Sequence, residues 1–300
     1  MSVAVLGSIN LDVVCVLDAL PRAKETALAR RVDYFLGGKG ANQAAAASKL
    51  GAETRLIGAV GGDQDGAFLL QELARLGVGV GAVAVAENEA SGRAFVFVDA
   101  EGQNTIVVAP GVNAAESVLQ DDASGCDVLL AQFERPIPLI QRAFAGARDA
   151  RWRIINAAPF VPAGRAAFPM ANVLLVNEVE LCGYAGAPAD DSMTDAAVVK
   201  IARTLLASDA GWVIVTLGAR GALAVAADRV VAAPGLPAAV VDTTGAGDCF
   251  AGALAAALDA RWEMERAVRF ANAAAAISVE RRGAAQSMPS KEEVLRRLAR

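Results

Sequence analysis

The sequence contains no histidine among its 300 residues. This absence excludes every site that depends on imidazole, including a Ser-His-Asp triad, a Cys-His pair and a histidine-ligated metal. Proton transfer near neutral pH must therefore rest on a carboxylate, or on a lysine, tyrosine or cysteine with a shifted pKa.

Cysteine is scarce as well, and its spacing matches no metal or redox motif. The four cysteines, Cys15, Cys126, Cys182 and Cys249, are scattered along the chain without a CxxC pair. This usage is typical of a reducing compartment and indicates neither a zinc site nor a disulfide framework. We therefore expect a cytoplasmic protein.

Long apolar runs and basic blocks are also missing. Although 55% of the residues are hydrophobic, no uninterrupted apolar stretch approaches the roughly 20 residues that cross a bilayer. Residues 1–7 lack a basic region and resemble a core strand rather than a signal peptide. The net charge of −5, without a basic cluster, argues against nucleic acid. We expect neither a membrane nor a nucleic acid as a partner.

Short apolar strands alternate with helices along most of the chain. The expected strands are residues 3–6, 128–130, 154–155, 173–176 and 213–216. The expected helices are residues 41–50, 67–76, 136–147, 194–207, the segment after Asp248, and 291–298, with Gly51 and Gly77 ending the first two. This alternation predicts an α/β fold with a mostly parallel central sheet covered on both faces. Without a linker or repeat, we expect a single domain over residues 1–300.

Two segments interrupt this pattern. Residues 11–36 and 91–108 contain runs of alternating polarity, such as 94–98 and 105–108, with a hairpin turn candidate at 101–104. We predict that they form a small β-sheet that projects from the main domain and serves as a lid or an interface.

The most informative motif is Asp242-Thr243-Thr244-Gly245-Ala246-Gly247-Asp248, which an apolar run follows at 251–258. It predicts a turn into a helix whose first N–H groups have no intrahelical partner. Gly245 and Gly247 leave those groups open to a phosphate. A carboxylate at Asp248 beside an anion site suits a base that deprotonates an attacking hydroxyl, which indicates phosphoryl transfer. An ordinary turn with an acidic first helical turn fits the same segment.

A second glycine-rich turn, Gly37-Gly38-Lys39-Gly40-Ala41-Asn42, also precedes a helix. It lacks the upstream glycine and the Ser/Thr of a Walker A loop, and the first strand leads into Gly7-Ser8-Ile9-Asn10 rather than GxGxxG. Open N–H groups, an ammonium and an amide so close together suit a polyhydroxyl ligand. A tight helix entry without a ligand is the structural alternative.

Polar residues follow several of the expected strands. Asn10 and Asp12 come after the first strand, and residues 132–134, 177–180 and 216–218 come after later ones. Because open α/β sheets bind ligands at the carboxyl ends of their strands, we expect these residues to line one site. Asn and Asp are also common in turns, so Asn10 and Asp12 alone allow a structural role.

Taken in order, five segments resemble the ribokinase (PfkB carbohydrate kinase) family over essentially the whole chain. They are residues 7–12, 37–43, 177–180, 216–221 and 242–248. The resemblance implies a ribokinase-like three-layer α/β/α sandwich with a small β-sheet lid inserted at about 11–36 and 91–108. It further implies an ATP-dependent phosphotransferase that converts D-ribose and ATP to D-ribose 5-phosphate and ADP. Residues 37–43 are similar to ribokinases in particular.

The same resemblance implies roles for individual residues. Asp248 matches the base, and Gly245, Ala246, Gly247 and Asp248 match the anion hole. The implied sugar ligands are Asn10, Asp12, Gly38, Lys39, Asn42, Glu134 and Asp248, with Ala94 and Val96 as apolar lid residues. The implied ATP site comprises Asn177, Thr216, Gly218, Gly221, Ala246, Gly247 and Asn272. Glu180 is implied to organise Mg²⁺ through water, and Asp242, Thr244, Ser278, Arg281, Gly283 and Ser287 to bind an activating K⁺.

The resemblance also implies a homodimer that forms through the β-lid. Two residues of this lid depart from the family pattern. Arg93 stands beside Ala94 where an apolar residue is expected, and Lys24 replaces a frequent glycine. Strand alternation predicts that Arg93 points away from the face of Ala94. The open alternatives are a family kinase for fructose, deoxyribose or a nucleoside, and a non-catalytic sugar-binding protein on the same fold.

Overall fold

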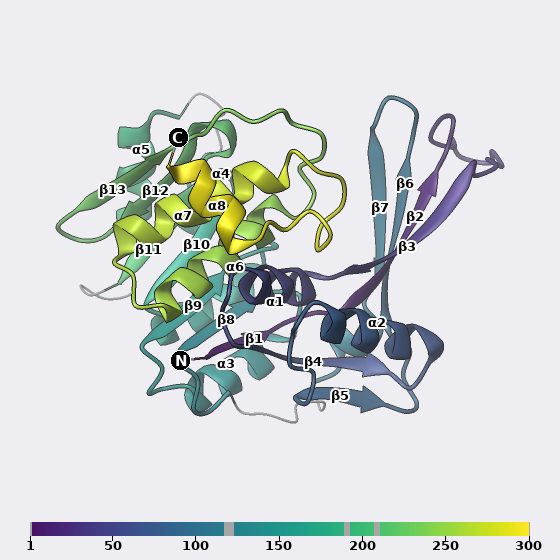
Figure 1. The fold of residues 1–300 in the computed structure, drawn as a ribbon, viewed down its shortest axis with the longest axis horizontal. Helices are drawn as coiled ribbons and strands as arrows, with labels where there is room; N and C mark the ends of the chain where they lie inside the picture. The colour runs from purple at the N-terminus through teal and green to yellow at the C-terminus, as the bar shows by residue number, and fades with distance from the viewer. Residues whose placement is uncertain (1, 117–122, 189–192, 207–210, 300) are drawn as a thin grey trace.

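The computed structural model describes residues 2–116, 123–188, 193–206 and 211–299. A large sheet runs through the main body, and a smaller sheet projects from one side of it (Figure 1). Helices lie on both faces of the large sheet, and the chain crosses between the two sheets near the start of α1.

In the described part of the chain, the large sheet has nine strands in the order β13-β12-β11-β10-β9-β8-β1-β4-β5. Their bounds are β1 (Val3–Leu6), β4 (Thr54–Gly61), β5 (Val83–Ala86), β8 (Val128–Gln132), β9 (Trp152–Asn156), β10 (Val173–Asn177), β11 (Trp212–Thr216), β12 (Gly221–Val225) and β13 (Val230–Pro234). From β11 to β5 in this order the strands pair in parallel, whereas β12 and β13 are antiparallel to their neighbours. The predicted mostly parallel sheet is confirmed.

The helices form the two outer layers. They are α1 (Lys39–Lys49), α2 (Gln64–Arg75), α3 (Ile137–Gly146), α4 (Glu178–Ala185), α5 (Asp195–Arg203), α6 (Ala246–Asp259), α7 (Met264–Ser278) and α8 (Lys291–Leu298), with 3-10 helices η1 (Gly111–Ala114), η2 (Pro162–Met170) and η3 (Gly218–Arg220). Among the described helices, none combines the length and the apolar composition that a membrane crossing needs.

Alternating side chains of β1 show why the sheet has a core on each face. Val3 and Val5 pack into the core shared with α1, α2, α6 and α7, whereas Ala4 and Leu6 pack into the core shared with α3, α4 and α5. Successive side chains of a strand point to opposite faces, so one short strand contributes to both cores. The predicted three-layer α/β/α sandwich is confirmed.

The predicted helices are present with shifted ends. Gly51 and Gly77 follow α1 and α2 with left-handed φ angles of 96° and 77°, which agrees with their predicted role as stops. Helix α5 ends at Arg203, and the predicted end at Ala207 lies outside the described residues. The expected elements did not include the strands β4, β5, β12 and β13 or the helices α4 and α7. For the Ala-rich strands β12 and β13 the reason is that alanine has little intrinsic β-preference, so their pairing in the sheet decides their conformation.

Four strands, counted over the described residues, form the small sheet in the order β3-β2-β6-β7. They are β2 (Asn10–Val16), β3 (Arg31–Gly37), β6 (Gly92–Val98) and β7 (Asn104–Ala109), and both predicted segments contribute to them. Lys24, in the loop between β2 and β3, has a φ of 71°, a region that favours glycine. This backbone agrees with the glycine of the family pattern at that position.

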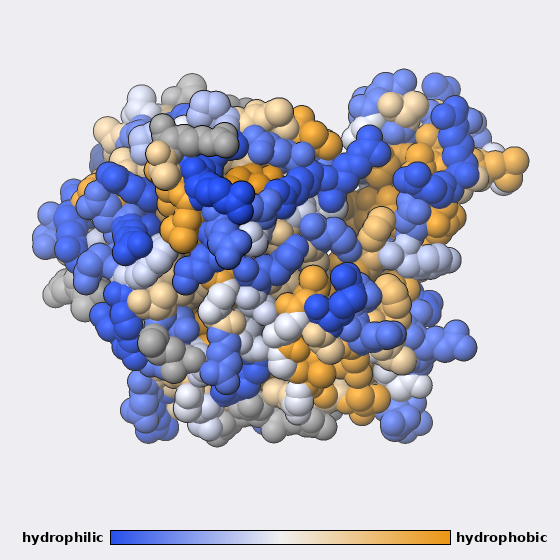
Figure 2. Space-filling view, viewed as in Figure 1, coloured by the Kyte–Doolittle hydropathy of each residue, from blue (hydrophilic) through white to orange (hydrophobic). Residues whose placement is uncertain are grey.

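A row of large side chains crosses one face of the small sheet. Tyr34, Val13, Phe95 and Val107 stand in register on the four strands, and Tyr34 and Val107 are 58% and 54% exposed. Figure 2 shows hydrophobic residues gathered on this projecting part of the molecule. The outer strands of the sheet therefore present apolar side chains to solvent, whereas Val13 packs against the core of the main body.

Candidate active site

The segment 242–248 forms the predicted turn into a helix. Gly245 adopts a left-handed conformation (φ 73°) directly before α6, and Asp248 is buried in the first turn. A Cβ added to Gly247 would meet no atom within 4 Å, so the space beside the first N–H groups of α6 is open. This geometry fits an anion site at a helix N-terminus with a carboxylate next to it.

The carboxylate of Asp248 is held by two residues near the start of α1. Asn42 Nδ2 donates to Asp248 Oδ2 at 3.0 Å, and Gln43 Nε2 donates to Oδ1 at 2.9 Å. Gln43 is itself oriented, because its Oε1 accepts from Gln132 Nε2 at 2.6 Å and its Nε2 also donates to Asn156 Oδ1 at 2.9 Å. The orientation of the Asp248 carboxylate is therefore set before a ligand binds.

Opposing effects adjust the proton affinity of Asp248. Burial raises its pKa, and the Lys39 ammonium, together with the amides of Gln43 and Asn42, opposes that rise. The Asp248 carboxylate in turn raises the pKa of Lys39. A carboxylate whose pKa moves upward while a cation limits the rise is suited to general base catalysis near neutral pH.

Glu134 lies on the other side of the same helix start. Its Oε2 accepts from the backbone N of Lys39 at 3.1 Å and from the hydroxyl of Ser8. Gly38 has a φ of 87°, and a Cβ there would lie 2.8 Å from the carbonyl oxygen of Ser8. The turn therefore needs glycine to approach the loop after β1, and this approach brings Lys39, Glu134 and Asp248 together.

The predicted sugar residues Asn10 and Asp12 lie on β2, two positions apart and on one face. Strand β6 pairs with β2 so that Ala94 stands opposite Asp12 and Val96 opposite Val14. The side chains of Ala94 and Val96 therefore share the face of Asp12, and Ala94 is buried. All four residues contribute to one surface at the base of the small sheet.

Asp12 is partly buried and electrostatically coupled to Glu134 and to Asp248 of α6. Burial raises the pKa of Asp12 to about 7, and the negative charges of Glu134 and Asp248 add to the rise. Arg93, by contrast, is exposed, and its Nε lies 2.6 Å from the carboxylate of Asp65. The prediction that Arg93 points away from the face of Ala94 is confirmed.

A pocket extends from Asp248 toward the carboxyl ends of β10 and β11. Its lining consists of Lys39, Asn156, Ala158, Leu175, Val176, Asn177, Glu180, Thr216, Thr243, Gly245, Ala246, Gly247 and Asp248. Four of the predicted ATP-site residues, Asn177, Thr216, Ala246 and Gly247, therefore surround the same space as the open helix start. Over the described residues, the lining does not extend to Gly218, Gly221 or Asn272.

Glu180 and Asn177 cap the start of α4 reciprocally. The N–H of Glu180 donates to Asn177 Oδ1 at 2.8 Å, and the N–H of Asn177 donates to Glu180 Oε2 at 2.9 Å. Burial raises the pKa of Glu180, so its negative charge is poorly solvated. Within the described residues, no three acidic or cysteine side chains come together as a metal site. Glu180 therefore fits Mg²⁺ as one carboxylate among water and phosphate oxygens.

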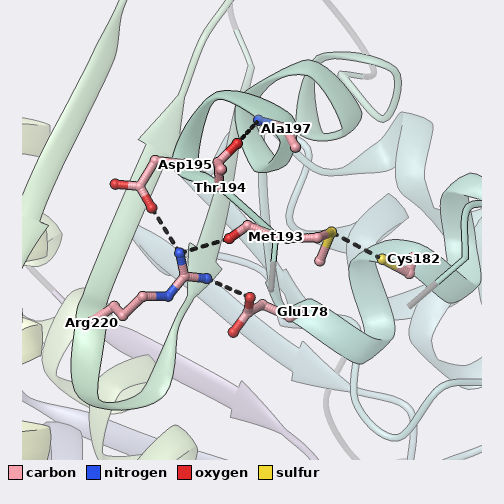
Figure 3. Close-up of polar contacts among 7 residues, drawn as sticks. All are labelled: Glu178, Cys182, Met193, Thr194, Asp195, Ala197 and Arg220. Atoms are coloured by element: carbon pink, nitrogen blue, oxygen red, sulfur yellow. Dashed lines mark hydrogen bonds and ion pairs between the residues drawn. The ribbon is translucent and has the colours of Figure 1, made fainter. Parts of the chain in front are cut away.

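Arg220, in η3, joins three segments at the loop that follows β11 (Figure 3). Its Nη2 lies 2.5 Å from Glu178 Oε1, and its Nη1 lies 2.9 Å from Asp195 Oδ1 and 3.0 Å from the carbonyl oxygen of Met193. Glu178 and Asp195 stand in the first turns of α4 and α5. Arg220 therefore ties the loop after Thr216 to the start of the helix that carries Glu180.

The other predicted ATP-site residues have different surroundings. Gly218 is exposed, and a Cβ there would meet no atom within 4 Å. A Cβ on Gly221 would lie 2.1 Å from the carbonyl oxygen of Ala233, so close pairing of β12 with β13 requires this glycine. Asn272 Nδ2 donates to the carbonyl oxygen of Pro234 at 2.8 Å and links α7 to the end of β13.

The predicted cation ligands lie in two loops that Asp242 joins. Asp242 Oδ1 accepts from the N and Oγ1 of Thr244 at 2.9 and 2.6 Å, and Oδ2 accepts from the N of Gly283 at 2.9 Å. Burial disfavours the ionised form, but these hydrogen bonds outweigh burial and lower the pKa of Asp242. A Cβ on Gly245 would lie 2.9 Å from Ala284 Cβ, so the second loop packs against the start of the anion site.

The remaining predicted cation ligands lie in or beside the second loop. The hydroxyls of Ser278 and Ser287 donate to the carbonyl oxygens of Ala275 and Ala284, at 2.9 and 2.8 Å. The guanidinium of Arg281 pairs with the carboxylate of Glu293. Hydroxyl, carboxylate and backbone oxygens dominate this region, and oxygen is the donor that a hard cation requires.

Sequence reasoning assigned no role to Gln43, Asn156 or Ser8. Asn156 ends β9, so the strand-end rule that identified Asn177 was sufficient to find it. Gln43 stood within a recognised motif, but its contact with Asp248 depends on the packing of α1 against α6. Ser8 contacts Glu134 across 126 positions, and no sequence signal indicates that pairing.

Comparisons with known proteins identify the family of the chain. The family model of the pfkB family carbohydrate kinases matches residues 1–291. Ribokinase from Bacillus subtilis is 34% identical, over 98% of this chain and 98% of its own length. The crystal structure of ribokinase from Thermotoga maritima superimposes with a TM-score of 0.89 at 34% identity over the full length of both chains. Arabidopsis thaliana ribokinase, solved in complex with ribose and ATP, gives a TM-score of 0.91 at 31% identity, covering 99% of this chain and 98% of its own.

Proposed function

Because the chain belongs to the PfkB family of carbohydrate kinases and so acts as a phosphotransferase on a sugar, we propose that it is an ATP-dependent ribokinase. It transfers the terminal phosphoryl group of ATP to the primary hydroxyl of D-ribose and forms D-ribose 5-phosphate and ADP. The observation that carries the proposal is the buried carboxylate of Asp248, held in a fixed orientation by Asn42 and Gln43 beside an open helix start.

Asp248 is the general base of the proposed reaction. It takes the proton of the sugar hydroxyl as the hydroxyl oxygen bonds to the transferred phosphorus, and the bond to the ADP oxygen breaks. The N–H groups of Gly245, Ala246, Gly247 and Asp248 form the anion hole for the charge on the transferred group. Because these dipoles are fixed by the turn and the helix, they need little reorganisation in the transition state.

The proposed sugar site lies at the junction of the two sheets. Asn10, Asp12, Gly38, Lys39, Asn42 and Glu134 are the proposed ligands of the ribose hydroxyls, and Ala94 and Val96 cover the sugar from the small sheet. Lys39 and Asn42 donate, while Asp12 and Glu134 accept. A sugar that lacks a matching hydroxyl leaves one of these buried groups unpaired, which lowers its transition-state binding.

The nucleotide occupies the pocket that continues from Asp248 to the ends of β10 and β11. Asn177, Thr216, Gly218, Gly221, Ala246, Gly247 and Asn272 are the proposed ATP-site residues. Glu180 is the proposed residue that holds Mg²⁺ through water, and the ion supplies charge neutralisation at the phosphates. The buried carboxylate of Glu180 at the pocket wall supports this assignment.

A monovalent cation, K⁺, is the proposed activator. Its proposed ligands are Asp242, Thr244, Ser278, Arg281, Gly283 and Ser287, several of them through backbone carbonyls. The link from Asp242 to Gly283 and the packing of Ala284 on Gly245 support this assignment, because they join the cation loops to the anion hole. An ordered loop there keeps the N–H groups of α6 aimed at the phosphoryl group.

The small sheet is the proposed lid and dimer interface of a single-domain enzyme. As a lid it excludes water, so that ATP hydrolysis does not compete with sugar phosphorylation. The apolar row of Tyr34, Val13, Phe95 and Val107 supports its use as the interface of a homodimer. The free thiols Cys15, Cys182 and Cys249 suit the reducing cytoplasm as its location.

A substrate panel tests the proposal. ADP release from ATP is measured with D-ribose, 2-deoxyribose, fructose or adenosine, in the presence of Mg²⁺ and K⁺, and turnover is expected to be fastest with D-ribose. Faster turnover with another acceptor would keep the role of Asp248 and change the sugar assignment. If none of the four is phosphorylated but a sugar still binds, the chain is a sugar-binding protein on this fold.

A further inference from the structure

Asn113, in the 3-10 helix η1, is a buried amide that lies outside the predicted site. Its Oδ1 accepts from the backbone N of Ile9 at 3.1 Å, and its Nδ2 donates to the carbonyl oxygen of Ile9 at 3.0 Å. A backbone N–H can only donate and a carbonyl oxygen can only accept. These two contacts therefore fix which end of the Asn113 amide is oxygen and which is nitrogen.

The same nitrogen reaches a proposed sugar ligand. Asn113 Nδ2 also donates to Asn10 Oδ1 at 2.9 Å, so both of its hydrogens are used. Because Asn113 presents a donor, Asn10 must present its carbonyl oxygen to Asn113. Nδ2 of Asn10 is then the end that remains for a ligand, on the strand face that Asn10 shares with Asp12.

Gly92 and Arg135 support this pair of amides. A Cβ on Gly92 would lie 2.2 Å from Asn113 Nδ2 and 2.3 Å from Asn10 Oδ1, so the contact exists only because residue 92 has no side chain. Arg135 Nη1 donates to the carbonyl oxygen of Val112 at 3.0 Å and reaches Asn113 Oδ1 at 3.5 Å. Gly92 therefore leaves room for the contact, and Arg135 holds η1 in place.

We propose that Asn113 is a positioning residue for sugar recognition, which holds Asn10 as a hydrogen-bond donor toward the acceptor sugar. This inference rests on the proposed function and adds a specificity device to it. Asn10 then donates to a sugar hydroxyl oxygen while the neighbouring Asp12 carboxylate accepts from a hydroxyl. The site thus requires two hydroxyls on the sugar, one that accepts a hydrogen bond from Asn10 and one that donates a hydrogen bond to Asp12.

The variant Asn113→Asp tests the proposal with almost no change in shape. It keeps an acceptor for the N–H of Ile9 but removes the donor toward both the carbonyl oxygen of Ile9 and Asn10. The Asn10 amide therefore turns its nitrogen toward residue 113 and offers its oxygen to the sugar. We expect the KM for the sugar to rise about tenfold or more, in line with the cost of an unpaired buried group. The KM for ATP and the kcat at saturating sugar should stay near their wild-type values.

Two further variants separate positioning from folding. In Asn10→Asp, assayed at pH 8, the carboxylate still accepts from Asn113 but donates nothing to the sugar. The buried charge beside Asp12 should lower the melting temperature, so the assay is run well below that temperature, where the KM for the sugar should still rise. Asn172→Asp is the matched control. Asn172 also pairs with backbone groups, because it accepts from the N of Arg153 and donates to the carbonyl oxygen of Arg151. It directly precedes β10, at the amino-terminal end of that strand, whereas the candidate site lies at the carboxyl ends of the strands. This control should lower stability without changing the KM for the sugar.

The outcomes separate this inference from the proposed function. If the wild-type chain turns over none of the panel sugars, the proposed function and this inference fall together. If the wild-type chain is active but Asn113→Asp and Asn10→Asp leave the KM for its sugar unchanged, this inference alone is overturned. Equal losses in all three variants would also overturn it, because the effect would then be structural.

Discussion

Gln43 Nε2 lies 2.9 Å from Oδ1 of Asp248, although the two residues are 205 positions apart in the chain. Gln43 is the fifth residue of α1, and Asp248 stands in the first turn of α6, so the N-terminal parts of two helices meet at this contact. The neighbouring Asn42 holds the second oxygen of the same carboxylate. The proposed base is therefore aligned by the packing of one helix against another.

The first prediction concerns the base itself. Asp248→Asn should reduce turnover by about 10²- to 10⁴-fold, the usual contribution of a general base, because the amide cannot take the hydroxyl proton. Sugar binding, measured by calorimetry, should be retained, since the side chain keeps its shape.

Asp259→Asn is the matched control for that variant. Asp259 is a second buried aspartate at the other end of α6, about 16 Å along the helix from Asp248 at 1.5 Å per residue. Its replacement should leave kcat unchanged. Wild-type turnover in Asp248→Asn would remove the assignment of the base.

The second prediction is a shifted pH profile in Lys39→Met. The Lys39 ammonium lowers the pKa of Asp248 against the rise caused by burial. Without it, Asp248 stays protonated to higher pH, so the acid limb of the kcat/KM profile should move to higher pH. The decrease in kcat/KM relative to wild type should therefore be larger at pH 6 than at pH 8.5. Lys39→Arg keeps the charge and should keep the limb near its wild-type position. Parallel losses at both pH values in Lys39→Met would contradict this coupling.

The third prediction links Asp12 to stability. Its pKa is raised from 3.8 to about 7 in the folded protein, first by burial and then by Glu134 and Asp248. The unfolded chain therefore loses this proton at lower pH than the folded protein. The stabilising contribution is complete below about pH 4 and disappears as the pH rises through 7.

Asp12→Asn removes this titration. Compared with wild type, its melting temperature should be higher by at least about 2 °C at pH 8, the effect of roughly 1 kcal/mol in a large domain. At pH 4 the two proteins should melt at similar temperatures, and the variant should bind the sugar more weakly. If the melting temperature of the variant exceeds that of the wild type by the same amount at both pH values, the charge of Asp12 is not the cause of the increase.

The fourth prediction concerns the monovalent cation. At equal ionic strength, turnover should be faster in K⁺ than in Na⁺, because the loops around Asp242 would bind the larger ion. Asp242→Ala should abolish this difference and lower the rate, since it also breaks the contacts with Thr244 and Gly283. Asp195→Ala, which removes an exposed carboxylate near Arg220, should keep the preference for K⁺. Equal rates in the two salts with the wild-type enzyme would eliminate the cation site.

The fifth prediction concerns assembly. Light scattering at micromolar concentration should give the mass of a dimer, and Val107→Asp should shift it toward a monomer, because it places a charge in the exposed apolar row. Gln103→Asp adds the same charge near the tip of the hairpin without removing apolar surface, and should leave the dimer intact. A wild-type monomer at this concentration would rule out the lid as a dimer interface.

By itself, the sequence determined the fold class and the local shape of the site. The alternation of β-branched runs with helices predicted the parallel sheet, because hydrophobic periodicity acts over a few residues and needs no distant partner. Gly245 and Gly38 marked the two helix starts for a similarly local reason, since their backbone angles of 73° and 87° suit glycine. The alternation of side chains along a strand was likewise enough to predict that Arg93 points away from the face of Ala94.

Tertiary structure alone decided which of these groups meet. The pairing of Gln43 with Asp248, of Ser8 with Glu134 and of Asn113 with Asn10 spans more than 100 positions in each case. The raised pKa of Asp12 likewise depends on carboxylates from two other segments. Burial and Coulomb interactions act through space, so no local pattern records them, and only the packed helices and sheets bring these side chains within contact distance.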